Sequence, residues 1–177
     1  MTEQQLEEVI YHGFNIRLSF LYEKPTFGDL FMIRGFDHPL FPPTDRFNFA
    51  ALENLGFDQV DDYFGIPNHE EDGGDVKVWL SPLVNDQSVY HHHGPFDGLE
   101  LSYCARRNPP HNTRLFLEVI SEFAQRLPVD VLYTLRNQDL GNPPNLASVR
   151  KDIEHVIAYW RAQDIEPGSS AAMRLTF

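Results

Sequence analysis

The sequence predicts an α+β fold, with a single-layer, mainly antiparallel sheet and amphipathic helices packed on one side. In the first half of the chain, short segments of alternating apolar and polar residues follow one another closely, as neighbouring strands do. In the second half, two longer segments repeat apolar residues every three to four positions, which is the helical period. With 177 residues, of which 42% are hydrophobic, the chain can bury one core. We therefore expect a single α+β domain over residues 1–165 and a flexible tail, rich in small residues, over 166–177.

A short helix is expected to begin the chain. Thr2 and Gln5 have the spacing of a capping box, which predicts a helix through about Val9. The clearest strand follows over 14–22, because its apolar side chains alternate with its polar ones. A turn after this strand predicts a hairpin partner over 29–35.

The middle of the chain predicts shorter elements. Thr44 is a suitable N-cap for a short helix over 45–55. The next stretch, 56–75, is acidic and contains several glycines, and we interpret it as a loop. Alternating apolar residues then predict strands over 76–80 and 99–103, joined by a long connection.

The second half of the chain has clearer patterns. A helix is expected to begin at Asn112 or Thr113, one of which caps it, and to end near Leu127 because a proline follows. A strand is expected over 129–135, and a last helix over 146–163.

Negative charge is concentrated in one segment. The formal charge is −12, and the eight acids from Glu53 to Asp75, with no Lys or Arg among them, account for −8 of it. Such a field repels nucleic-acid phosphates and steers basic partners toward the surface that carries it. We therefore expect a basic protein partner and no nucleic acid. The alternative explanation is a solvated surface that keeps the protein soluble.

Aromatic side chains are interleaved with these acids, and protein interfaces combine aromatic anchors with polar rims. In this hypothesis the acids speed the encounter, and the rings supply the desolvated contacts. The predicted partner-binding residues are Phe57, Asp58, Asp61, Asp62, Tyr63, Phe64, Glu70, Glu71 and Asp72.

A second hypothesis concerns the run His91-His92-His93. In an extended segment His91 and His93 point the same way, and such a pair can bind zinc, copper or iron. Asp97 would complete the set of metal ligands. The arrangement is loosely similar to the first cupin motif, but the carboxylate is Asp rather than Glu and no second His motif follows. A polar loop with solvated imidazoles is the alternative explanation.

Several other classes of function find no signature in the sequence. It contains no G-x-S-x-G, G-x-G-x-x-G or Walker-type motif, so we predict no catalytic residue and no cofactor. The single cysteine excludes an internal disulfide. The N-terminus is polar and acidic, unlike a secretory signal, and no apolar run approaches the roughly 20 residues of a membrane span. We therefore expect a cytoplasmic protein with no membrane partner.

In overall make-up the chain resembles the small immunity proteins of bacterial toxin–immunity systems, of the type VI secretion or polymorphic toxin kind. The likeness is carried by residues 96–163, which contain a strand at Leu99–Tyr103, a helix, a second strand and a closing helix ending in Tyr159-Trp160. The resemblance implies a non-enzymatic protein that neutralises a cognate toxin by binding it directly.

Two further functions remain as alternatives to toxin neutralisation. One is a metal-binding enzyme or module that uses the His-x-His pair. The other is an adaptor that binds a peptide or a sister subunit along an exposed sheet edge.

Overall fold

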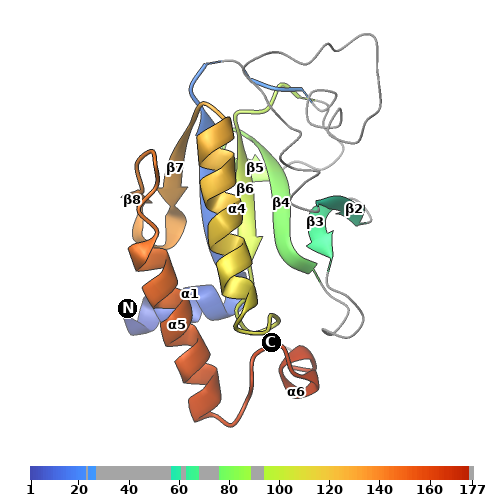
Figure 1. Cartoon of the computed structure of the whole chain (residues 1–177), viewed down its shortest axis with the longest axis vertical. Coiled ribbons are helices and arrows are strands. Elements are labelled where there is room, and N and C mark those ends of the chain that lie inside the picture. The colour runs from blue at the N-terminus through green and yellow to red at the C-terminus, as the bar shows by residue number, and fades with distance from the viewer. Residues whose placement is uncertain (23, 27–56, 61–62, 68–75, 89–93, 176–177) are drawn as a thin grey trace.

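A computed structural model describes residues 1–22, 24–26, 57–60, 63–67, 76–88 and 94–175 (Figure 1). In chain order its elements are α1 (Glu3–His12), β1 (Phe14–Phe20), β2 (Asp58–Val60), β3 (Tyr63–Pro67), β4 (Val76–Val84), β5 (Gln87–Ser88), β6 (Gly98–Tyr103), α4 (Asn112–Arg126), β7 (Val129–Tyr133), the 3-10 helix η3 (Thr134–Arg136), β8 (Gln138–Asp139), α5 (Ala147–Ala162) and α6 (Ser170–Met173). The predicted α+β class is confirmed. The hairpin partner predicted over 29–35 and the helix predicted over 45–55 lie outside the described residues.

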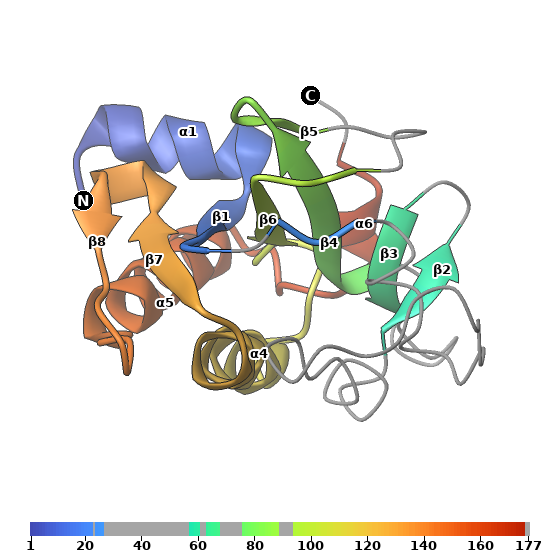
Figure 2. The same ribbon diagram turned by 90° about the horizontal axis from the view of Figure 1, so that it is seen from above.

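The strands form one antiparallel sheet in the order β2-β3-β4-β6-β1-β7-β8, and β5 pairs with β4. The strand β1 lies inside the sheet, where Ile16 is opposite Leu101 of β6 and Tyr133 of β7. Figure 2 shows α4 and α5 on one side of the sheet, and α1 on the far side of β7 from α4. The hairpin of β2 and β3 therefore lies at one edge of the sheet, and β8 lies at the other.

The N-terminal helix and strand are confirmed, but α1 extends to His12, beyond the predicted Val9, and β1 ends at Phe20 rather than at residue 22. The Thr2 hydroxyl accepts the backbone N–H of Gln5, and the Gln5 side chain accepts the backbone N–H of Thr2, so the capping box is present. The helix α1 ends at Gly13, whose φ is 71°. A Cβ at this position would lie 2.8 Å from the carbonyl oxygen of Tyr103, so only glycine allows the direct connection from α1 to β1.

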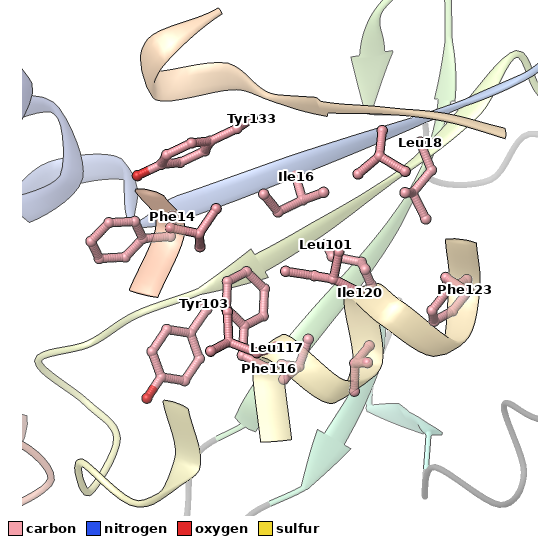
Figure 3. Packing of buried hydrophobic residues seen from close by; sticks show 14 of the residues in the cluster. Phe14, Ile16, Leu18, Leu101, Tyr103, Phe116, Leu117, Ile120, Phe123 and Tyr133 are labelled. Atoms are coloured by element: carbon pink, nitrogen blue, oxygen red, sulfur yellow. The ribbon is translucent and has the colours of Figure 1, made fainter. Parts of the chain in front are cut away.

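The core lies between the sheet and the two long helices (Figure 3). Figure 3 shows the side chains of α4 directed toward those of β1 and β6. The ring of Tyr103 stacks on Phe116, with ring centroids 4.9 Å apart and an interplanar angle of 11°. The predicted helical periodicity is confirmed, because α5 buries one regular face: Val149, Ile153, Val156, Ile157 and Trp160.

One part of the predicted fold is wrong. The stretch 56–75, interpreted as a loop, contains the strands β2 and β3. Its acids and glycines indicated a loop, but Val60, Tyr63 and Ile66 have high strand propensity. Pairing with β4 adds the tertiary contacts that turn this propensity into a hairpin.

The start of α4 also differs from the prediction. His111 occupies the N-cap position, without a side-chain hydrogen bond to the helix. Asn112, which we expected as a cap, is buried and donates instead to the side-chain oxygen of Asn108 at 3.0 Å.

The C-terminal segment from residue 166 contains α6 and contacts the body of the domain. Buried Arg106 donates through Nη1 to the carbonyl oxygen of Ala172, and to that of Leu175 at 3.0 Å. The backbone at Gly168 passes so close to Pro109 that a Cβ would lie 2.5 Å from the proline nitrogen. The predicted tail is therefore held at specific points as far as residue 175.

Candidate functional site

The acidic segment includes the terminal hairpin of the sheet. The strands β2 and β3 pair with Val60 opposite Tyr63 and Asp58 opposite Gly65, and β2 is the last strand in the sheet order. Figure 2 shows this hairpin at the edge farthest from α1 and α5. Edge strands carry backbone N–H and C=O groups that a partner chain can bind. The segment that the sequence indicates for partner binding thus includes the strand that ends the sheet within the described residues.

The hairpin is held closely against the rest of the sheet. Gly65 of β3 lies opposite Trp79 of β4, and a Cβ at Gly65 would lie 2.5 Å from Cγ1 of Val76. It would also lie 3.3 Å from the carbonyl oxygen of Val78. Both valines are buried, so the absence of a side chain at Gly65 allows β3 to pack against the buried part of β4.

Phe57 connects the start of the hairpin to α4. Its ring meets Phe123 edge-on, with centroids 5.9 Å apart and an interplanar angle of 88°. Aromatic pairs of this geometry contribute about 0.5–1.5 kcal/mol beyond the area that they bury. Phe57 is only half-buried, so part of its surface remains open to a further contact.

The structure describes the backbone of three more of the predicted partner-binding residues, which lie in β2 or β3: Asp58, Tyr63 and Phe64. The remaining ones lie outside the described residues: Asp61, Asp62, Glu70, Glu71 and Asp72. Partner binding by this set stays a prediction.

Of the predicted metal ligands, the structure describes only Asp97, since His91 and His93 lie outside the described residues. The Asp97 carboxylate is engaged by protein groups: Lys24 Nζ lies 2.6 Å from one oxygen, and the backbone N–H of Asn85 donates to the other at 2.7 Å. The hydrogen bond from Lys24, then that from Asn85 and the Lys24 charge, hold the pKa of Asp97 below its usual value. Asp97 therefore ties the chain after β1 to the turn after β4.

Within the described ranges, no three His, Cys, Asp or Glu side chains are grouped closely enough to hold a metal ion. The part of the chain that the structure describes also has no helix with the length and apolar character needed to cross a bilayer.

Sequence reasoning missed a groove between α4 and α5. Its volume is about 1020 Å³, and residues from along both helices line it. Buried Leu117 and Ile157 form part of the lining. The rest combines charged side chains of both helices, most of them exposed, with uncharged residues such as Ser121 and Ala158. The sequence does contain a sign of this groove, because each helix carries residues spaced four apart on a face next to its apolar one. These residues are Arg114, Glu118 and Glu122 in α4, and Arg150, Glu154 and Ala158 in α5.

No protein-family model and no curated protein matches the sequence. The resemblance to immunity proteins therefore stays a prediction.

Proposed function

We propose that this chain is a non-enzymatic binding protein that neutralises a basic protein partner, a cognate bacterial toxin, by binding it through the β2–β3 hairpin and the other acidic residues of the segment from Glu53 to Asp75. The observation that carries the proposal is that the acidic segment contains β2 and β3, which end the sheet among the described residues. A surface at the end of a sheet can meet a partner without rearrangement of the core.

The charge supports a basic partner. Eight acids and no Lys or Arg lie between Glu53 and Asp75, whereas the rest of the chain holds 18 acids and 14 bases, from totals of 26 and 14. A concentrated negative field raises the rate at which a basic protein arrives and orients. Nearby aromatic side chains suit the desolvated centre of an interface.

The packing of the hairpin supports a preformed binding surface. The absence of a side chain at Gly65 allows β3 to pack closely against the buried valines of β4, and Phe57 contacts Phe123 of α4. The strands β2 and β3 are already paired in the sheet, so they lose less conformational entropy when a partner binds, and this increases affinity.

The experiment begins with purification of a tagged copy from the native host and identification of the proteins that accompany it. We expect one basic protein in a one-to-one ratio. That protein is then produced alone, and its toxic activity is titrated with the purified chain. Loss of the activity at one equivalent supports the proposal. A partner that remains fully active at saturation contradicts neutralisation, and the absence of any stoichiometric partner contradicts binding.

The same preparation tests the metal-binding alternative. Metal content is measured in the purified protein and in the His93→Ala variant. Stoichiometric metal that the variant loses, together with no protein partner, would replace the proposed function with a metal-binding one.

A further inference from the structure

We propose that the groove between α4 and α5 is a second protein-binding surface, which accepts an amphipathic helix carrying one acidic and one basic side chain beside its apolar stripe. The groove is lined by residues of α4 and α5. The β2–β3 hairpin lies at the edge of the sheet farthest from α5 (Figures 1 and 2). This inference is therefore independent of the proposed neutralising function.

The lining of the groove suits a helix. It extends from Pro110, just before α4, through the successive turns of α4 to Glu122, and along α5 from Leu146 to Arg161. Leu117 and Ile157 are buried, while the charged residues beside them are exposed. Proteins bind amphipathic helices in long grooves that have apolar residues at the base and charged residues on the walls. The bound helix inserts apolar side chains that lie three or four positions apart in its sequence.

The facing sides of the two helices explain why the groove exists. Helices pack tightly when large apolar side chains of one fit between those of the other. Here the facing sides carry small residues, such as Ser121 and Ala158, together with charged ones. The two helices still contact each other, and the groove lies along this contact, where small and charged side chains leave its surface open.

The charges on the walls determine which helix fits. The two helices run in opposite directions, so the start of α4 and the end of α5 lie at the same end of the groove (Figure 1). That end carries Arg114 and Arg161, and the middle of the groove carries Glu118 of α4 and Glu154 of α5. The opposite end carries one charge of each sign, Glu122 of α4 and Arg150 of α5, and so favours neither. An acidic side chain thus suits the arginine end, and a basic one suits the glutamates.

These charges are free to take new partners. Arg114 pairs with Glu118 at 2.9 Å and Arg161 with Glu166 at 2.8 Å, but all four side chains are at least half exposed, and such pairs contribute little. Glu154 has no ion pair within the described part of the chain. A basic side chain above Glu154 would give it one.

The test uses a synthetic amphipathic peptide of about four helical turns, roughly 16 residues, with a leucine stripe flanked by one Glu and one Lys. A second peptide carries Gln at both charged positions. Binding is measured from amide chemical shifts during titration of the whole chain. We expect the charged peptide to shift resonances of α4 and α5, and to bind about fivefold more tightly than the Gln peptide.

Two variants locate the site, since Ala158 and Ala162 are both exposed on α5 but only Ala158 lines the groove. Ala158→Trp is expected to weaken binding by about tenfold or more, because the indole fills the groove. Ala162→Trp is expected to leave the affinity unchanged, which controls for general effects of an added indole.

A charge exchange tests the pattern itself. Glu154→Lys is expected to weaken binding of the Glu/Lys peptide about fivefold, and replacement of the peptide Lys by Glu is expected to restore it. No binding of any peptide, or equal affinity for both Trp variants, overturns the proposal. A dimer that Ala158→Trp dissociates in sedimentation analysis also overturns it, because a second copy would then be the occupant.

Discussion

Arg136 binds both carboxylate oxygens of Asp152, with Nε 2.6 Å from Oδ2 and Nη2 2.7 Å from Oδ1. Asp152 is 2% exposed and also accepts the hydroxyl of Tyr133 at 2.8 Å. Because Tyr133 ends β7 and Asp152 belongs to α5, this cluster joins the sheet to the helix that forms one wall of the groove. A buried carboxylate with three donors is fully satisfied, and its loss leaves those donors without their acceptor.

Asp152→Ala is expected to lower the free energy of unfolding by about 2–4 kcal/mol, because the buried Tyr133 hydroxyl loses its acceptor and the Arg136 charge loses its partner. The measurement is urea unfolding, read as a shift of the midpoint at constant slope. Glu154→Ala, on an exposed turn of the same helix, serves as the control and is expected to change stability by less than about 0.5 kcal/mol. Equal losses in the two variants would show that the cluster does not stabilise the fold.

The same carboxylate predicts a loss of stability in acid. Burial raises the pKa of Asp152, but hydrogen bonds from Arg136 and Tyr133, with the Arg136 charge, outweigh burial and hold the pKa below 3.8. The unfolded chain therefore takes up the proton first as the pH falls. The stabilisation is complete above the ordinary carboxyl pKa and is lost as the pH falls through the folded-state pKa.

Asp152→Asn isolates this effect, because asparagine keeps the shape of the side chain but does not titrate. The stability difference between wild type and variant is expected to be constant at neutral pH and to shrink between about pH 5 and pH 2. Urea unfolding at a series of pH values measures it. A difference that stays constant down to the acid limit would mean that Asp152 titrates normally.

A pair of glycines tests how the C-terminal segment is attached. Gly168 and Gly141 have φ of 80° and 77°, so alanine is strained at both. The nearest atom to an added Cβ is 2.5 Å away at Gly168, on the backbone of Pro109, but 3.8 Å away at Gly141.

Gly141→Ala is therefore expected to cost about 1–2 kcal/mol from backbone strain alone, and Gly168→Ala about 2–4 kcal/mol from strain and overlap together. Urea unfolding gives both values, and amide exchange at Ala172 reports whether α6 separates from the body. If the two variants lose the same free energy of unfolding, the overlap of the new Cβ with Pro109 does not add to the destabilisation.

Elements whose residues repeat at one regular period could be predicted from the sequence. The strand β1 and the helices α4 and α5 each bury every second residue or one helical face, so local pattern alone locates them. The hairpin of β2 and β3 could not be predicted in this way. Its strands are short and one is partly acidic, and its position depends on the fit of Gly65 against Val76.

The candidate sites also differ in whether one continuous segment of the sequence forms them. The acidic segment is continuous in sequence, so its charge could be counted directly. The groove forms between two helices that are separated in the sequence by β7. The pattern within either helix does not indicate how far apart the two helices lie in space. The sequence places Asp97 near three histidines and so suggests a metal ligand, but its partners Lys24 and Asn85 lie 73 and 12 residues away along the chain.

The last prediction concerns the partner recovered with the chain. Replacement of Asp61 and Asp62 by lysine changes the formal charge from −12 to −8, since each substitution adds two units. The same change at Glu7 and Glu8, which are exposed on α1 at the opposite end of the sheet from the hairpin, gives a matched control. Electrostatic attraction depends on where charge sits as well as on its sum, so the two variants are expected to differ.

Stopped-flow or surface-based association kinetics at low and high salt measure this difference. The variant at Asp61 and Asp62 is expected to associate about tenfold more slowly at low salt, with a weaker dependence on salt, whereas the control changes by less than about twofold. Equal slowing of both variants would assign the effect to net charge and remove the hairpin as the contact surface. An unchanged rate in both would show that the acidic segment does not steer the partner, because the proposed attraction acts mainly on association.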